Sequence, residues 1–173
     1  MTRHYPPLAI TAYWARLNDT IIDLIDYIPD DKLGWSPKPE LFNFRGILLH
    51  MALARHNWME RDAQDGLELG VGPAGSGSGL SIEERTAALL RHGRTKEELK
   101  DNLRWSWDRL LAFLSDPATL DKLYTGTHPD GVAFSQDGHW IAFHGLEHDV
   151  HHRADIFHYL ALLGVAHPDV GTP

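Results

Sequence analysis

The sequence has no cysteine among its 173 residues. Disulfide bonds, thiolate nucleophiles and thiolate metal ligands are therefore excluded. This absence agrees with a reducing compartment, and we expect a cytoplasmic protein. A chain of this length buries about 70% of the surface that its unfolded form exposes, so one hydrophobic core can stabilise it without covalent cross-links. We predict a single domain that spans residues 1–173.

Basic residues and long apolar runs are also scarce. The chain has 16 Lys and Arg against 24 Asp and Glu, which gives a formal net charge of −8. Nucleic-acid binding depends on clustered Lys and Arg, so this balance argues against such a partner. No stretch approaches the ~18 consecutive apolar residues of a membrane-spanning helix, and the first seven residues lack the apolar run of a signal peptide. We expect a soluble protein that binds neither nucleic acid nor a membrane.

Two common catalytic signatures are missing as well. The Gly/Ser-rich segment 66–79 lacks the Gly-Lys-Ser/Thr ending of a phosphate-binding loop. The chain also lacks the Gly-x-Ser-x-Gly elbow that presents a nucleophilic serine. The sequence therefore gives no sign of a phosphate-binding loop or of a serine nucleophile of this type.

Helical periodicity is what the sequence does contain. Apolar residues recur at intervals of three and four, which is typical of amphipathic helices. The third such helix begins at a capping box, Thr95-Lys-Glu-Glu98, and the last ends before Gly164, a typical C-terminal cap. The four predicted long helices span residues 8–28, 42–65, 95–114 and 139–163.

The connections complete the predicted architecture. Residues 66–79 have the composition of a long flexible loop, and a second capping box at Ser81 opens a short helix that ends near Gly93. Residues 124–134 form a turn-rich insert, with a small hairpin expected around Asp130-Gly131. We predict an all-α fold: a four-helix bundle with a long loop after the second helix and an insert before the last.

The last predicted helix carries a pair of histidines. Four residues separate His148 from His152, so both imidazoles lie on one helical face, one turn apart. Two neutral imidazoles at this spacing can bind one transition metal ion. Both belong to a stripe that includes Ile141, Gly145 and Tyr159, and we expect this stripe to face the bundle interior.

A third histidine lies far upstream, on the second predicted helix. His50 stands within the apolar run 47–52, which indicates burial. If the fold brings His50 to the His148 and His152 pair, the three form a metal site with positions left open for water or substrate. In the alternative, each is an ordinary hydrogen-bonded core histidine, since an isolated pair at this spacing arises readily in a chain with 12 histidines.

Three segments together resemble the DinB/YfiT-like superfamily, and the resemblance spans almost the whole chain. They are Leu48-Leu49-His50-Met51-Ala52, the preceding Trp35-Ser-Pro37 connector, and His148-Asp-Val-His-His152-Arg153 ahead of the Leu-Leu-Gly164 end. The resemblance implies a four-helix bundle in up-up-down-down order, often a homodimer, that holds a divalent metal ion by three histidines. By match to the motif, these ligands are His50, His148 and His152.

The resemblance also bears on activity. The superfamily includes thiol-dependent S-transferases, a mycothiol-dependent isomerase and metal-dependent hydrolases. It therefore implies a metal-dependent enzyme with a small electrophilic substrate and, in the transferase case, a low-molecular-weight thiol. Imidazole and water suit Zn, Ni, Fe and Mn alike. The alternative is a non-catalytic metal-stabilised stress-response or binding bundle, which would want a fourth protein ligand to close the site.

One position departs from the family pattern. The usual His-Arg-Gly-Gln is here His152-Arg153-Ala154-Asp155. Asp155 can orient a ligand histidine through the second ring nitrogen, as carboxylates do at metal sites. It can instead pair with Arg153 or another surface cation.

Several neighbouring residues have expected positions. His144, one turn before His148, is expected at the pocket mouth or in contact with substrate. Glu147 and His151 are assigned to a solvated or interface face. His56 lies on a different helical face from His50 and is not expected to be a ligand.

Two acidic residues and several arginines remain as candidates for roles in catalysis. Glu60 and Asp149 could act as general bases only if the fold turns them inward. A thiol that carries carboxylates requires cations at the pocket rim. The candidate cations are Arg16, Arg45, Arg55 and Arg61.

Overall fold

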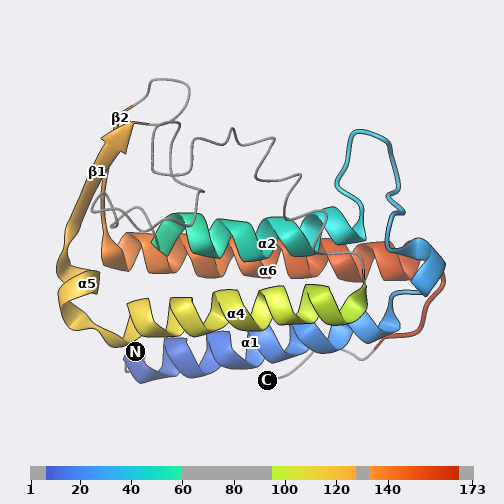
Figure 1. Cartoon of the computed structure of the whole chain (residues 1–173), viewed down its shortest axis with the longest axis horizontal. Coiled ribbons are helices and arrows are strands. Elements are labelled where there is room, and N and C mark those ends of the chain that lie inside the picture. The colour runs from blue at the N-terminus through green and yellow to red at the C-terminus, as the bar shows by residue number, and fades with distance from the viewer. Residues whose placement is uncertain (1–6, 60–94, 128–132, 168–173) are drawn as a thin grey trace, which may run out of the picture.

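A computed structural model describes residues 7–59, 95–127 and 133–167. Most of these residues are helical, which confirms the all-α prediction (Figure 1). The long helices are α1 (Pro7–Tyr27), α2 (Phe44–Met59), α4 (Lys96–Ser115) and α6 (Gly138–Leu162). The shorter elements are the 3-10 helix η1 (Asp30–Lys32), the helix α5 (Pro117–Asp121) and the strands β1 (Leu123–Thr127) and β2 (Ala133–Asp137).

Local capping explains where two of the long helices begin and end. At the start of α4 the predicted capping box is formed: the Glu98 N–H donates to the Thr95 side chain, and the Thr95 N–H donates to the Glu98 carboxylate. The Asp137 carboxylate caps α6 by accepting the Trp140 N–H at 2.7 Å. Helix α6 ends before Gly164, whose φ of 69° lies in the left-handed region that favours glycine.

The insert before the last helix contains the expected hairpin. Strands β1 and β2 pair antiparallel, with Tyr124 opposite Gln136. The predicted turn at Asp130-Gly131 lies outside the described residues, and so do the Gly/Ser loop, the short helix at Ser81 and residues 60–65 of the second predicted helix.

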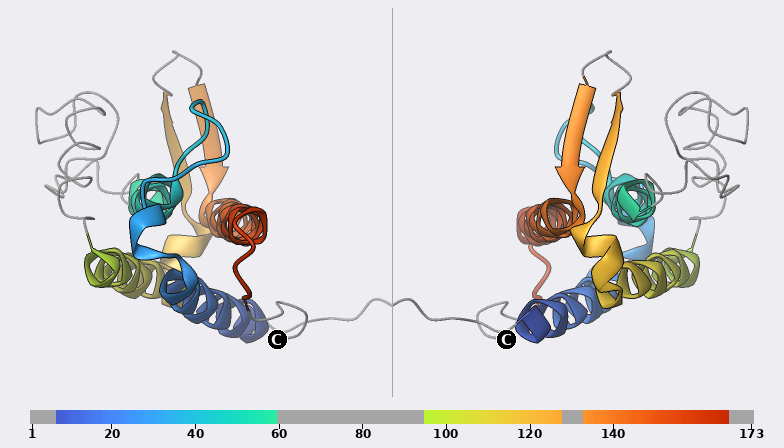
Figure 2. Two further views of the ribbon diagram at one scale, coloured as in Figure 1. Left: turned by 90° about the vertical axis from the view of Figure 1, so that its right-hand side faces the viewer. Right: turned by 90° about the vertical axis from the view of Figure 1, so that its left-hand side faces the viewer.

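The four long helices form a square when viewed along their axes (Figure 2). Helix α2 packs against α4 and α6, and α1 packs against the same two helices. Consecutive helices α1 and α2 therefore occupy one diagonal, and α4 and α6 occupy the other. Each long helix buries a face against two neighbours.

The predicted up-up-down-down order is wrong, because the helices run up, down, down, up (Figure 1). The start of α4 lies beside the end of α1, where Lys100 Nζ donates to Asp26 Oδ1 at 2.6 Å. The connector between α1 and α2 explains the reversal. It is hydrogen-bonded back onto the start of α2, through Arg45 N–H to the Leu33 carbonyl, so α2 begins at the end of the bundle where α1 finishes.

The core lies along the axis of the bundle and draws on all four long helices. Its largest fully buried apolar side chains include Trp14 from α1 and Phe44 from α2. In the predicted stripe of α4, Leu99, Leu103 and Leu110 are buried, whereas Leu111 is 38% exposed. Burial of this apolar surface is the main term that stabilises the bundle. Within the described residues, no helix is long and apolar enough to cross a membrane.

Candidate metal centre

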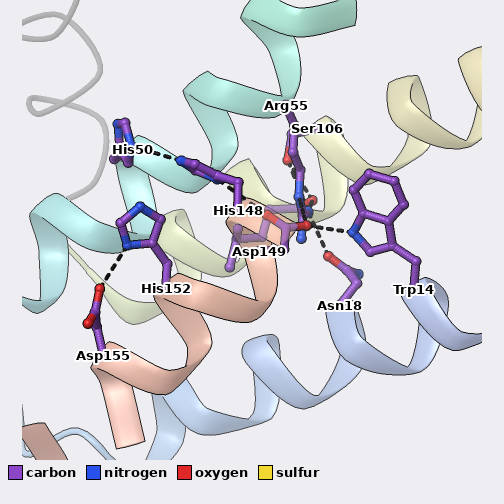
Figure 3. Close-up of polar contacts among 10 residues, drawn as sticks. Trp14, Asn18, His50, Arg55, Ser106, His148, Asp149, His152 and Asp155 are labelled. Carbon is purple, nitrogen blue, oxygen red and sulfur yellow. Dashed lines mark hydrogen bonds and ion pairs between the residues drawn. The ribbon is translucent and has the colours of Figure 1, made fainter. Parts of the chain in front are cut away.

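The structure brings the three predicted ligands together on two antiparallel helices. His50 lies in the middle of α2, and His148 and His152 lie one turn apart on α6 (Figure 3). The Nε2 atoms of His50 and His148 are 2.9 Å apart, although 98 residues separate them in the sequence. One ring nitrogen from each of the three histidines lies within 4.8 Å of the others.

The cluster is partly shielded from solvent. His152 is buried and the other two imidazoles are half-buried. The ring of Phe42, which precedes α2, stacks on His50 with a centroid distance of 5.2 Å. Phe42 itself is 54% exposed, so one of its faces reaches solvent beside the histidines. The sequence predicts only that Phe42 begins a helix, because helical periodicity does not reveal which ring a side chain will stack on.

Asp155 lies behind His152, as one of its two predicted roles requires. Its Oδ2 atom is 3.0 Å from His152 Nδ1. With the proton on Nδ1, the His152 ring donates to this carboxylate, and its Nε2 keeps a lone pair for a metal ion. Figure 3 shows Nδ1 turned toward Asp155 and the rest of the ring turned toward His50 and His148.

The surroundings of the cluster favour neutral imidazoles. Burial, followed by the neighbouring rings of His148 and His152, lowers the pKa of His50 from 6.5 to about 4. Burial and the His148 ring also lower the pKa of His152, although the hydrogen bond with Asp155 acts in the opposite direction. At neutral pH both rings are therefore uncharged, which is the form that binds metal ions.

The other predicted positions on α6 are found mostly where the sequence places them. His151 and Glu147 are exposed, in agreement with a solvated face. His144 is half-buried and stacks on Trp140 with a centroid distance of 4.9 Å. His151 Nε2 also lies 3.7 Å from Asp155 Oδ2, and a second group of metal-ligand type, formed by His151, His152 and Asp155, shares His152 with the first.

Two of the predicted roles for charged residues need correction. Arg55, predicted as a cation at the pocket rim, is only 2% exposed and lies in the core. Asp149, a general base only if turned inward, is fully buried and forms an ion pair with Arg55, Nε to Oδ2, at 2.9 Å. Burial of a lone guanidinium is costly, and this carboxylate is what compensates it. Asp149 is therefore not accessible to a substrate as a base.

This ion pair is the centre of a polar network that joins all four long helices (Figure 3). The Trp14 indole of α1 donates to Asp149 Oδ2 at 2.6 Å. Arg55 Nη1 donates to Asn18 Oδ1 at 2.8 Å and reaches Ser106 of α4 at 3.4 Å. Sequence periodicity alone missed this network, because polar residues at core positions carry no mark of their partners.

The remaining candidates contribute less. Arg16 is exposed on α1, and Arg45 is half-buried on α2 with an Nε atom that has no hydrogen-bond partner among the described residues. The side chains of His56, Glu60 and Arg61 lie outside the described part of the chain.

The donor set fits a divalent metal ion of intermediate softness. Three neutral imidazole nitrogens from two helices are typical ligands of Zn, and they also suit Fe and Ni. The carboxylate of Asp155 behind His152 is the usual outer partner of a metal-bound imidazole. Among the described residues, no fourth side chain of ligand type joins the group that contains His50.

Comparison with known proteins agrees with the fold. The fold is a four-helix bundle with histidines on its second and last long helices. The model of the DinB family matches residues 1–173. The chain belongs to the DinB family. No curated protein matches the sequence. A solved structure of a DinB-like protein from Bacillus subtilis is similar in fold, with a TM-score of 0.62 and 14% sequence identity over 93% of this chain and 95% of that one.

Proposed function

We propose that the protein binds one divalent metal ion through His50, His148 and His152 and acts as a metal-dependent enzyme on a small electrophilic molecule. The observation that carries this proposal is the convergence of three imidazole nitrogens within 4.8 Å from two helices. Membership of the DinB family supports it, because the resemblance of the motifs to those of the family implies metal ligands at these three positions. A divalent ion held by neutral imidazoles supplies Lewis acidity, which lowers the pKa of a water or thiol that reaches it.

The chain's own residues have defined tasks in this proposal. The Asp155 carboxylate holds the His152 proton on Nδ1 and so fixes the orientation of that ring. Phe42 covers one side of His50 and limits access of water from that side. Its exposed face offers apolar contact to a substrate at the cluster.

Two reaction types remain within the proposal, thiol S-transfer and hydrolysis. S-transfer to a low-molecular-weight thiol that carries carboxylates requires cations near the histidines. The burial of Arg55 removes one of the four predicted cations from this task. The two reactions are separable by assay, because S-transfer consumes the thiol and hydrolysis does not.

A metal-stabilised bundle without activity is the competing proposal. It requires a fourth protein ligand, and the arrangement of the neighbouring residues disfavours it. Asp155 is engaged with His152 Nδ1, and His144 stacks on Trp140. The proposal includes a homodimer, which a measurement of molecular mass in solution tests. It leaves the metal ion as Zn, Ni, Fe or Mn, which metal analysis decides.

Metal content measured by elemental mass spectrometry tests the site. We expect about one equivalent of a divalent metal in the tag-free protein and loss of this metal in His50→Ala. The matched control is His158→Ala, because His158 is an exposed histidine on the same helix as two of the ligands. The control should keep the metal.

Two outcomes would contradict the assignment. Absence of metal after reconstitution with Zn, Ni, Fe or Mn would leave the three histidines as core residues. Retention of metal in His50→Ala with its loss in His151→Ala would move the site to His151, His152 and Asp155. If metal binding is confirmed, turnover of esters and of electrophiles with thiols then separates an enzyme from a structural site.

A further inference from the structure

Asp149 is the residue of the buried network that lies closest to the histidine cluster. It follows His148 directly in the sequence, and its side chain is fully buried. Its two carboxylate oxygens have different surroundings. Oδ2 accepts hydrogen bonds from the Trp14 indole and from Arg55 Nε. Oδ1 accepts no hydrogen bond from any described residue.

The nearest imidazole nitrogen to this unpaired oxygen belongs to His148. The distance from His148 Nδ1 to Asp149 Oδ1 is 3.9 Å, which is longer than a hydrogen bond but close enough for the carboxylate to attract the N–H dipole of a neutral ring. A buried carboxylate oxygen without a donor is unfavourable, because burial removes the water that would otherwise bind it. A proton on His148 Nδ1 is therefore attracted to Oδ1.

The contact between His148 and His50 depends on the same proton. Their Nε2 atoms are 2.9 Å apart, so one of the two nitrogens carries a proton and the other accepts the hydrogen bond. If Asp149 keeps the His148 proton on Nδ1, then His148 Nε2 is the acceptor and His50 Nε2 is the donor. The lone pair of His148 Nε2 then points into the cluster.

We propose that Asp149 is the positioning residue of His148: its unpaired Oδ1 holds the imidazole proton on Nδ1 and keeps Nε2 free to bind the metal ion. This inference rests on the proposed metal site. It assigns to the four-helix network a role beyond packing, because Trp14 of α1 and Arg55 of α2 fix the carboxylate that orients a ligand of α6. Asp155 has the corresponding place behind His152.

The variant that tests the proposal must not leave a lone buried charge. Asp149→Asn alone would leave Arg55 buried without its counter-ion and would disturb folding, so we pair it with Arg55→Met. The double variant removes both charges and leaves the histidines in place. The control is Asp101→Asn/Arg104→Met, which removes an exposed ion pair of α4 and leaves the contacts of Asp149 unchanged.

The first measurement needs no metal. In metal-free protein labelled with ¹⁵N-histidine at pH 8, we expect the nitrogen shifts of His148 to report a proton on Nδ1. This proton should move to Nε2, or exchange between the two nitrogens, in Arg55→Met/Asp149→Asn, and should stay on Nδ1 in Asp101→Asn/Arg104→Met. The same His148 tautomer in all three proteins would overturn the proposal.

The second measurement is Zn affinity, by competition with a chromophoric chelator. Loss of an outer partner typically weakens metal binding about 10- to 100-fold, and we expect this for the double variant. Asp101→Asn/Arg104→Met should stay within about threefold of the parent, which is below that range. Equal affinities of the parent and the folded double variant would overturn the role of Asp149. A parent that binds no Zn refutes the proposed function instead, whereas the tautomer still decides the interaction between Asp149 and His148.

Discussion

Asp155 Oδ2 lies 3.0 Å from His152 Nδ1, one helical turn along α6. This contact leaves Nε2 as the only nitrogen of His152 that can face the other two histidines. We expect Asp155→Ala to weaken Zn binding about 10-fold, because the His152 ring loses the partner that fixes its tautomer. Glu147→Ala is the control, since the Glu147 side chain is 68% exposed on the same helix. Identical Zn affinities of the two variants would contradict the orienting role of Asp155.

Metal binding should stabilise the folded protein. A ligand that binds only the folded state raises the free energy of unfolding by about 2.7 kcal/mol at a free concentration 100 times its Kd. We expect Zn to produce a shift of this size in urea denaturation of the parent and no shift in His50→Ala. An equal shift in His50→Ala would show that Zn stabilises the protein through other residues.

The sequence predicts the site better than it predicts the arrangement of the helices. His148 and His152 share a helical face because of their spacing, and His50 stands in an apolar run. Both patterns predict that the three side chains turn toward the interior of the bundle. The apolar pattern of a helix is the same whether the helix runs up or down. The order up-down-down-up depends instead on the connector at Leu33, whose backbone contacts no periodicity reveals.

The buried ion pair could not be predicted for a related reason. Asp149 lies about 100° around the helix from His148. A prediction based on one inward-facing stripe of α6 therefore does not include Asp149 among the buried residues. In the square bundle α6 packs against both α1 and α2, so its buried surface is wider than one stripe and includes Asp149. The pairing with Arg55 joins residues 94 positions apart and depends on the tertiary structure alone.

The stability of the metal-free protein should fall in acid. Because the pKa of His50 is about 4 in the folded state and 6.5 in the reference state, the unfolded chain binds the proton more readily. The contribution of neutral His50 to the free energy of unfolding is complete above pH 6.5 and is lost as the pH falls from 6.5 toward 4. With allowance for solvent screening of this half-buried ring, we expect a loss of about 2 kcal/mol.

Urea denaturation between pH 7.5 and 4.5, with a chelator present, measures this loss. His50→Gln should reduce the slope of stability against pH in this range, because glutamine does not titrate. Phe42→Ala should have a smaller effect in the same direction, since it removes the ring stacked on His50 and returns the pKa of His50 toward 6.5. An unchanged slope in His50→Gln would assign the acid sensitivity to other groups.

Gly145 tests the packing next to the buried network. A Cβ atom at this position would lie 2.9 Å from Cη2 of the fully buried Trp14 ring, which is closer than real contacts allow. We expect Gly145→Ala to destabilise the protein by about 1–3 kcal/mol, although alanine is the better helix former. The control is Gly34→Ala, because nothing lies within 4 Å of the added Cβ atom there. A gain in stability in Gly145→Ala would show that Trp14 moves aside readily.

The ion pair of Arg55 and Asp149 provides the last prediction. Arg55→Met leaves a fully buried carboxylate without its cation, and we expect a loss of about 3–5 kcal/mol in urea denaturation of the metal-free protein. Arg104→Met breaks an exposed pair with Asp101 and should cost less than about 1 kcal/mol. Equal losses in the two variants would show that water reaches the Arg55 site.

The double variant Arg55→Met/Asp149→Asn should recover most of this stability, because a buried ion pair often contributes no more than apolar residues of the same volume. Recovery would mean that packing alone gives no reason for a buried carboxylate at this position. Weak Zn binding by a double variant as stable as the parent would then show that Asp149 acts on metal binding through its contact with His148. A double variant as unstable as Arg55→Met would show instead that the bundle depends on the hydrogen bonds of Asp149 to Trp14 and on those of Arg55 to Asn18.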